Sequence, residues 1–464
     1  LLSALADALP IWQQAGNRIL LTSRPYGLDP SGLARLGLPS AALEPLPTEL
    51  QTLFIQRWFH TLDKPALGAG LQASLSHRDD LDPLTENPLL LTALCVIYGN
   101  GRRLPEDRYH LYQRIVDNVL YNRYPGDARS REPIKARLEA VALGMHLGLD
   151  AERGTPAAEV ADVEIEGLLA RFAELSPAYA SGRIEPALQR EELQTRSGLL
   201  LPRTGNRSAF YHLSLQEFLA AERLARTSDE RAALEQQFRR WGSVPEWRPT
   251  LLFLFAAQVF NYRDAQWGLD LLTRLTADLR RPEVKANPAP AVLVAEALEL
   301  CLAKGYRLPT TLAEDFRGIC RAAIDDEIAV KDRHRLGLCL GLLGDQRIKD
   351  LQDPDASVQV PAGDYVYGED DQPLRIDVPF RLSRYPVTNS QYRAFIEAGG
   401  YRERSYWSDA GWAWLQQTGV IQPVYWDERR WNGPSQPVVG VSFWEAEACC
   451  RWAGGRLPTE QEWE

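Results

Sequence analysis

The sequence predicts a multidomain protein that is mainly α-helical, with an α/β segment at the N-terminus and an α+β region at the C-terminus. Its 464 residues suffice for about three domains of roughly 150 residues each. Hydrophobic residues make up 45% and charged residues 25%, which is typical of globular proteins. Residues before about 350 are rich in Leu, Ala, Arg and Glu, whereas residues 355–464 contain eight of the thirteen Trp. A domain boundary is therefore predicted at the polar joint 349–355.

Charge, hydropathy and cysteine usage exclude several classes of protein. The formal net charge of −10, from 52 basic and 62 acidic residues, disfavours a surface that coats nucleic acid. The longest apolar run covers residues 251–257, far short of the ~20 residues that span a bilayer, and no signal peptide opens the chain. Six cysteines without a CxxC pair indicate buried, reduced thiols in a cytoplasmic protein. Because the chain lacks an initiator Met and stops directly after a strong local motif, we expect it to be a fragment.

The first forty-five residues predict a short α/β segment. An amphipathic helix over residues 1–14 ends at Gly16-Asn17, and the apolar run 19–22 is suited to a buried strand of a parallel sheet. Ser23 and Arg24 follow at the strand's carboxyl end, where open α/β sheets bind ligands. Their hydroxyl and guanidinium groups suit a phosphate. The alternative is an Arg that only caps a helix or forms a surface ion pair.

Residues 46–124 predict a small helical domain. Thr48 and Gln51 have the spacing of a capping box. Pro88 stands at the start of an apolar run, and a proline in the first helical turn costs little. A further helix over about 107–121 is expected to bury Tyr109, Tyr112, Ile115, Val116 and Val119.

Residues 125–228 predict helices followed by a β-hairpin. The runs 199–201 and 209–211 would be its strands, with the turn at 204–206, and a helix over 214–225 would follow. This succession suggests a winged helix. Residues 229–352 give further helical pairs, for example 247–260 and 291–303, without a fixed-period repeat.

Four runs, in this order, together resemble the C-terminal part of a NACHT-type STAND nucleotide switch: Ser23-Arg24-Pro25, Leu46-Pro47 with Trp58-Phe59, Asn87-Pro88-Leu89, and the run 211–221 with His212. In that family they belong to the sensor 1 strand, the small helical domain and the winged helix. The resemblance implies that Ser23 and Arg24 lie near the γ-phosphate position, that Pro88 contacts the adenine–ribose end, and that His212 contacts the β-phosphate of ADP. The alternative for His212 is a buried side chain bonded to a backbone carbonyl.

The phosphate-holding loop of such a switch does not occur in the sequence. No GxxxxGK[ST] motif and no apolar run ending in paired acids is present, so the parts that hold ATP or ADP with Mg²⁺ are missing. Since these elements precede sensor 1 in the family, we expect them upstream in an intact ATPase parent. The 464-residue chain itself is expected not to hydrolyse ATP.

Residues 355–464 carry a second resemblance. The runs 360–368, 378–382, 384–392, 437–446 and 455–464 closely resemble the N-terminal half of a formylglycine-generating enzyme (sulfatase-modifying factor) domain, which has a C-type-lectin-like fold. Within them, Thr388 is positioned to cap a helix over 390–398, and Ser442 with Glu445 forms a capping box for a helix over 443–452. The aromatic residues are expected mostly to pack a core, and strands of the other half should complete its sheet.

The chemistry of that family is not expected within this chain. Its catalytic cysteine pair and most metal ligands follow the last matching run. Cys449 and Cys450 are neighbours on a predicted helix, so their side chains point about 100° apart and are expected to be small apolar residues of that helix. No catalytic residue and no metal ligand is predicted.

The predicted domains are the remnant of a nucleotide-binding domain (1–45), a small helical domain (46–124), a winged helix (125–228), a helical linker (229–352) and a partial C-terminal domain (355–464). The prediction is part of a nucleotide-regulated switch in bacterial signalling or defence, whose C-terminal domain recognises a protein or ligand and which forms a homo-oligomer on activation, without membrane or nucleic acid. One alternative is a sulfatase-modifying oxidase, which needs a cysteine pair and copper ligands. The other is a non-catalytic interaction scaffold.

Overall fold

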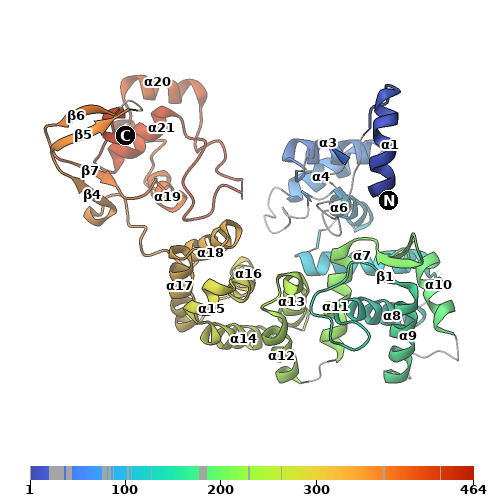
Figure 1. Ribbon diagram of the computed structural model, residues 1–464. Coiled ribbons are helices and arrows are strands. Elements are labelled where there is room, and N and C mark those ends of the chain that lie inside the picture. The colour runs from blue at the N-terminus through green and yellow to red at the C-terminus, as the bar shows by residue number, and fades with distance from the viewer. Residues whose placement is uncertain are drawn as a thin grey trace.

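Over the residues that it describes, the computed structural model is mainly helical, with three small sheets (Figure 1). It describes residues 2–19, 36–37, 44–75, 81, 85–86, 88–101, 104–105, 107–126, 128–176, 185–227, 230–262, 264–368, 371–428 and 430–464. Across these ranges no helix is both long and apolar enough to cross a membrane. The predicted strand 19–22 lies almost wholly outside them, as do Ser23 and Arg24.

The N-terminal helices are α1 (Leu2–Gln14), α3 (Thr48–Thr61), α4 (Pro65–Leu75) and α6 (Pro88–Gly101). Phe59 of α3 is completely buried, and Gly68 of α4 lies close against it. The predicted capping box of Thr48 is wrong. Pro47 takes the N-cap position without a side-chain cap, so Thr48 already lies inside the helix, and Gln51 Nε2 instead donates to the Leu46 carbonyl at 2.6 Å.

The middle of the chain combines helices with a three-stranded antiparallel sheet of order β1-β3-β2. Its elements are α7 (Arg108–Arg123), α8 (Ala128–Leu147), β1 (Val160–Ala161), α9 (Asp162–Leu175), α10 (Pro186–Arg196), β2 (Leu200–Arg203), β3 (Arg207–Phe210) and α11 (Leu213–Thr227). The predicted hairpin is confirmed, with Leu200 opposite Phe210 and Arg203 opposite Arg207. Gly205 and Asn206 reverse the chain with positive φ angles of 76° and 53°, which Gly and Asn tolerate best. The strand β1 was not predicted, because a strand of two residues is too short to show the alternation of apolar and polar residues that marks a strand.

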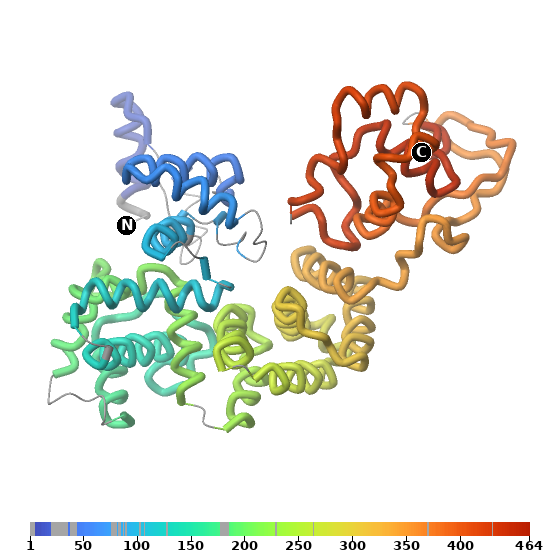
Figure 2. Tube along the Cα trace, turned by 180° about the vertical axis from the view of Figure 1, so that it is seen from behind, coloured from blue at the N-terminus to red at the C-terminus, as the bar shows by residue number. Residues whose placement is uncertain are grey.

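A succession of helices leads from α11 toward the C-terminal domain (Figures 1 and 2). These are α12 (Arg231–Trp241), the 3₁₀ turn η3 (Pro245–Trp247), α13 (Arg248–Ala256), the π-helical turn η4 (Ala257–Asn261), α14 (Ala265–Asp278), α15 (Arg281–Ala286), α16 (Ala289–Ala303), α17 (Thr310–Asp325) and α18 (Val330–Leu342). The predicted helix 247–260 is therefore split into α13 and a π turn. One continuous hydrophobic core extends from Ile55 to Leu343.

The C-terminal region has its own core. Its elements are η5 (Pro354–Ala356), β4 (Ser357–Val360), β5 (Gly363–Tyr367), β6 (Gln372–Ile376), β7 (Phe380–Ser383), α19 (Asn389–Glu397), η6 (Arg404–Tyr406), α20 (Asp409–Thr418), α21 (Phe443–Trp452) and α22 (Glu460–Trp463). β4 pairs with β7 and β5 with β6 as two separate antiparallel ladders. Tyr392, Phe395, Trp407 and Trp426 lie at the centre of the core. The capped helices predicted at Thr388 and at Ser442 are confirmed.

Candidate functional site

His212 lies in the turn that joins β3 to α11. Its Nδ1 accepts the backbone N–H of Ser214 at 3.2 Å and also contacts the Ser214 hydroxyl. That hydroxyl accepts the O–H of Tyr112, which comes from α7, at 2.8 Å. The Ser214 hydroxyl therefore donates its own O–H in a hydrogen bond to Nδ1. A neutral imidazole that accepts at Nδ1 carries its proton on Nε2, so this network makes Nε2–H the donor of the ring.

Aromatic packing holds this turn in place. Phe218 lies one helical turn beyond Ser214. The centroid of its ring is 5.6 Å from the ring centroid of Tyr109, 6.0 Å from that of Tyr112 and 5.5 Å from that of Phe253. These rings come from α7, α11 and α13, and Phe218 is completely buried. Because an interior packed to this density resists displacement, the position of His212 is set by the core beneath it.

Of the four residues predicted to bind nucleotide, two are described. Pro88 is the exposed first residue of α6, and the segment before it is tied to α3 because Leu46 N–H donates to the Glu86 carbonyl at 2.9 Å. His212 is partly buried at the β3–α11 turn. Ser23 and Arg24 lie outside the described residues. That the four meet around one nucleotide stays a prediction.

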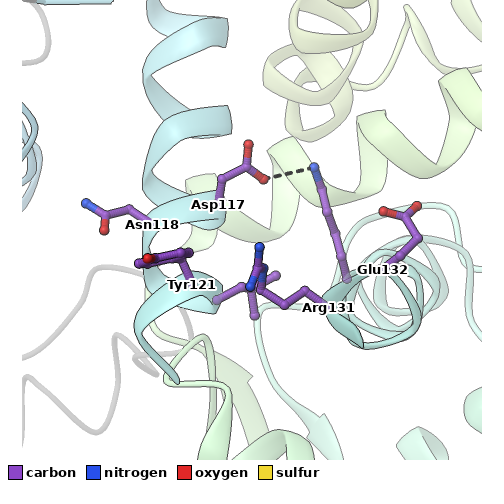
Figure 3. A pocket seen from close by; sticks show the side chains of 7 residues that line it. Asp117, Asn118, Tyr121, Arg131 and Glu132 are labelled. Atoms are coloured by element: carbon purple, nitrogen blue, oxygen red, sulfur yellow. Dashed lines mark hydrogen bonds and ion pairs between the residues drawn. The ribbon is translucent and has the colours of Figure 1, made fainter. Parts of the chain in front are cut away.

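A pocket of about 530 Å³ opens between α7 and the start of α8 (Figure 3). It is lined by Asp117, Asn118, Leu120, Tyr121, Arg131, Glu132 and Lys135. Lys135 Nζ lies 3.3 Å from Asp117 Oδ1, the ion pair drawn in Figure 3, and 3.9 Å from Glu222 Oε2 of α11. Arg131 donates to the Gly126 carbonyl at 2.7 Å and stacks on Tyr121. The cations of the pocket thus already have partners within the protein.

Beneath the pocket the structure buries charged groups that the sequence analysis did not single out. Glu139 of α8 is completely buried, and its Oε1 lies 3.3 Å from Arg226 Nη2. Desolvation by burial raises the pKa of Glu139 to about 8, although Arg226 and Lys135 act in the opposite direction. Glu222 accepts the O–H of Tyr109 at 2.7 Å. In the sequence, Lys135 and Glu139 look like an ordinary exposed i, i+4 pair, so only burial distinguishes them.

The C-terminal core contains a second buried polar group. Glu445 is 3% exposed; its Oε2 accepts the N–H of Ser442 at 2.7 Å and its Oε1 accepts the O–H of Tyr401 at 2.6 Å. Tyr401 is in turn 3.1 Å from the Tyr392 hydroxyl. Both carboxylate oxygens are therefore used to join the start of α21 to α19 and the loop that follows it.

The described residues do not fit a copper–thiol centre. Cys449 is buried and desolvation raises its pKa to about 12, while burial also raises the pKa of Cys450. A thiol is a metal ligand and nucleophile as the thiolate, which these shifts oppose. Within the described ranges no group of three or more His, Cys, Asp or Glu side chains could hold a metal ion.

The comparisons with known proteins place the C-terminal region in a class. The family model of the sulfatase-modifying factor enzyme 1-like domain matches residues 345–464. Residues 345–464 are therefore a domain of the sulfatase-modifying factor type, with a match that begins at 345 rather than at the predicted 355. The Asp345–Arg347 ion pair, 2.7 Å long, falls inside the matched range.

Among individual proteins, this chain is similar to hercynine oxygenase of Mycolicibacterium thermoresistibile, with 50% identity over 99 residues, covering 19% of this chain and 22% of the relative. It is 37% identical over 114 residues to the formylglycine-generating enzyme of Thermomonospora curvata, covering 18% and 36% of the two chains. It is 32% identical over 166 residues to the inactive C-alpha-formylglycine-generating enzyme 2 of Mus musculus, covering 27% and 52%. The chain spans between 22% and 30% of the length of the hercynine oxygenases that it matches.

Proposed function

We propose that this chain is part of a nucleotide-regulated signalling switch, in which ADP or ATP holds the helical region in one arrangement and the sulfatase-modifying-factor-type domain recognises a protein or small ligand. The observation that carries the proposal is the bonding of His212 Nδ1 to the backbone N–H and the hydroxyl of Ser214. The Tyr112–Ser214–Nδ1 chain makes Nε2–H a donor, as a contact with a β-phosphate oxygen requires. A ring N–H that bridges the β3–α11 turn to a bound nucleotide would couple the phosphate state to a rotation of whole domains.

Two further features support the proposal. Residues 128–210 contain helix, strand, helix, helix, strand and strand in that order, the connectivity expected of the winged helix that follows the small helical domain in NACHT-type switches. Pro88 is exposed at the start of α6, where a nucleotide base could approach it. In this proposal Ser23 and Arg24 serve the γ-phosphate, Pro88 the adenine–ribose end and His212 the β-phosphate of a nucleotide that binds with Mg²⁺.

The test is the affinity of the complete gene product for a fluorescent ADP analogue. We expect His212→Leu to weaken binding by at least about tenfold, because a hydrogen bond to a charged group contributes roughly 1.5–3 kcal/mol. His212→Gln, which keeps N–H donors, should recover part of the loss. His334→Leu, at an exposed position on α18, is the matched control. Equal affinity of the His212→Leu variant and the unmodified protein, at unchanged thermal stability, would overturn the assignment.

A second candidate function is oxygenase or oxidase chemistry in the C-terminal domain. It is favoured by the 50% identity to a hercynine oxygenase over 99 residues. The similarity to a formylglycine-generating enzyme that is itself named inactive supports recognition without catalysis instead. Oxygen consumption by the same full-length sample, supplied with iron or copper and a thiol substrate, discriminates between them: turnover supports the oxidase, and nucleotide binding without turnover supports the switch.

A further inference from the structure

The C-terminal domain lies next to α18 (Figure 1) and contacts this helix through residues 433 and 435. Gly341 is buried in this contact. A methyl group at residue 341 would overlap Oγ of Ser435 and lie 3.1 Å from its backbone nitrogen. The Ser435 hydroxyl is 3.5 Å from the carbonyl oxygen of Gly337, one helical turn earlier. Gly433 lies against Leu338 on the same helix.

The loop that meets α18 is firmly attached to the core of its own domain. The side-chain amide of Asn389 donates to the carbonyls of Trp431 and Gly433 at 2.7 and 3.0 Å. The backbone N–H groups of Asn389 and Ser390 donate to the carbonyls of Gln436 and Pro434, both at 2.9 Å. Asn389 is 2% exposed and begins α19, which carries two of the rings at the centre of the core. The loop 433–436 therefore moves with the whole domain.

The segment between α18 and the domain is held at both ends. Arg317 of α17 donates from Nε and Nη2 to the Leu343 carbonyl at 3.2 and 2.7 Å. At the other end, Gln391 Nε2 of α19 donates to the Lys349 carbonyl at 2.6 Å. Arg347 stacks on the ring of Tyr385 with its guanidinium carbon 5.9 Å from the centroid. The connection is thus a bonded joint and not a free tether.

We propose that the face of α18 that carries Gly337 and Gly341 is the docking surface for loop 433–436. This contact makes α17, α18 and the C-terminal domain one rigid unit. A displacement of the domain when it binds its partner is then passed to α18, whose buried Leu336, Cys339 and Leu340 belong to the main core. The inference holds whether or not the N-terminal region binds nucleotide. It makes α18 the element through which recognition reaches the rest of the molecule.

The test is limited trypsin digestion of the full chain, since Arg347 and Lys349 lie in the joint. Gly341→Leu should expel the loop and speed cleavage at these two residues by at least about tenfold, because proteolysis follows the population of the open state. Small-angle scattering should show a larger radius of gyration. Gly318→Ala on α17 is the matched control: no described atom lies within 4 Å of the added carbon, so cleavage should stay at the unmodified rate.

A pair of milder variants covers the case in which Gly341→Leu fails to fold. Gly341→Ala should open the joint partly, and Ser435→Gly, which removes the overlapping side chain, should return the double variant toward the unmodified rate. Wild-type cleavage and scattering in Gly341→Leu, or in Gly341→Ala where only that variant folds, would overturn the proposal. So would equal cleavage of Gly341→Ala with and without Ser435→Gly.

Discussion

Glu139 shows what a single buried residue does to the protein. Its carboxyl group is completely buried between Arg226 and Lys135, and burial raises its pKa from 4.5 to about 8. Between these values the folded state keeps a proton that the unfolded state has lost. The contribution of Glu139 to stability is therefore present below pH 4.5 and is lost as the pH rises through about 8.

Two other buried groups define the best pH range for a measurement. His146 is completely buried between the Ala142 carbonyl and Thr250, and burial lowers its pKa from 6.5 to about 4. Between pH 6.5 and about 4 the folded state keeps His146 neutral, whereas the unfolded state binds a proton there. His146 therefore lowers stability as the pH falls through this range, which is opposite to the effect of Glu139. Burial raises the pKa of Glu217 to about 7, so Glu217, like Glu139, makes the protein less stable as the pH rises. Between pH 6.5 and about 7 both acidic groups act together, and between about 7 and 8 only Glu139 still acts.

We predict that Glu139→Gln reduces the loss of stability between pH 6.5 and 8.5. One proton of difference between the two states changes the free energy of unfolding by about 1.4 kcal/mol per pH unit, and the variant removes that slope for Glu139 alone. The melting temperature, followed by circular dichroism at several pH values, measures it. Glu174→Gln, on the exposed side of α9, is the control. Parallel pH profiles for Glu139→Gln and the unmodified protein would contradict the prediction.

At the scale of the element, three helices of the C-terminal domain begin with the same local device. Thr388 with Gln391, Ser442 with Glu445, and Thr459 with Glu462 form complete capping boxes. They differ in what surrounds them. Glu445 is buried and also accepts the Tyr401 hydroxyl, whereas α22 is an exposed helix of only four residues.

We predict that Ser442→Ala destabilises the C-terminal domain by about 1 kcal/mol, the usual effect of losing an N-cap. Glu445→Ala should cost at least about twice as much, because it removes the buried carboxylate that accepts both the Tyr401 O–H and the Ser442 N–H. Thr459→Ala, with the same chemistry on α22, should change stability by less than about 0.5 kcal/mol. Urea unfolding followed by tryptophan fluorescence measures all three. Equal effects of Ser442→Ala and Glu445→Ala would show that the buried carboxylate adds nothing beyond the cap.

At the scale of the whole molecule, the described residues form two separate hydrophobic cores. One extends from Ile55 to Leu343 and the other is centred on Tyr392 and Phe395. In Figure 2 the C-terminal domain stands apart from the N-terminal helices and meets the rest at α18. The loop 433–436 joins the two parts without merging their cores, so they should unfold as separate cooperative units.

We predict two transitions in differential scanning calorimetry. Phe395→Ala removes a completely buried ring and should destabilise the C-terminal transition by about 3–5 kcal/mol, while Leu254→Ala should lower the other by about 2–5 kcal/mol. Each variant should leave the other transition within about a degree. A single transition that shifts in both variants would mean that the parts unfold as one unit.

Local structure followed from the sequence wherever neighbouring residues decide it. The helix at 443–452 and the hairpin around residues 204–206 were predicted because capping and turn residues act over three or four positions. The same reasoning failed at Thr48, where Pro47 occupies the cap and moves the helix start by one residue. The motifs of residues 355–464 also predicted a domain of the sulfatase-modifying factor type, and the family comparison confirms that domain over residues 345–464.

What the sequence alone determined is thus the mainly helical character of the chain, the hairpin around residues 204–206, the capped helices that follow Thr388 and Ser442, and the class of the C-terminal domain. Only the tertiary structure decided the tautomer of His212, the burial of Glu139 and the contact of Gly341 with Ser435. The hydrogen bond between Tyr112 and Ser214 joins residues that are 102 positions apart in the sequence. The contact between Ser435 and the Gly337 carbonyl joins residues that are 98 positions apart. Periodicity and capping carry no information over such separations, because contacts of this kind arise only when whole helices pack and exclude water around the groups they bring together.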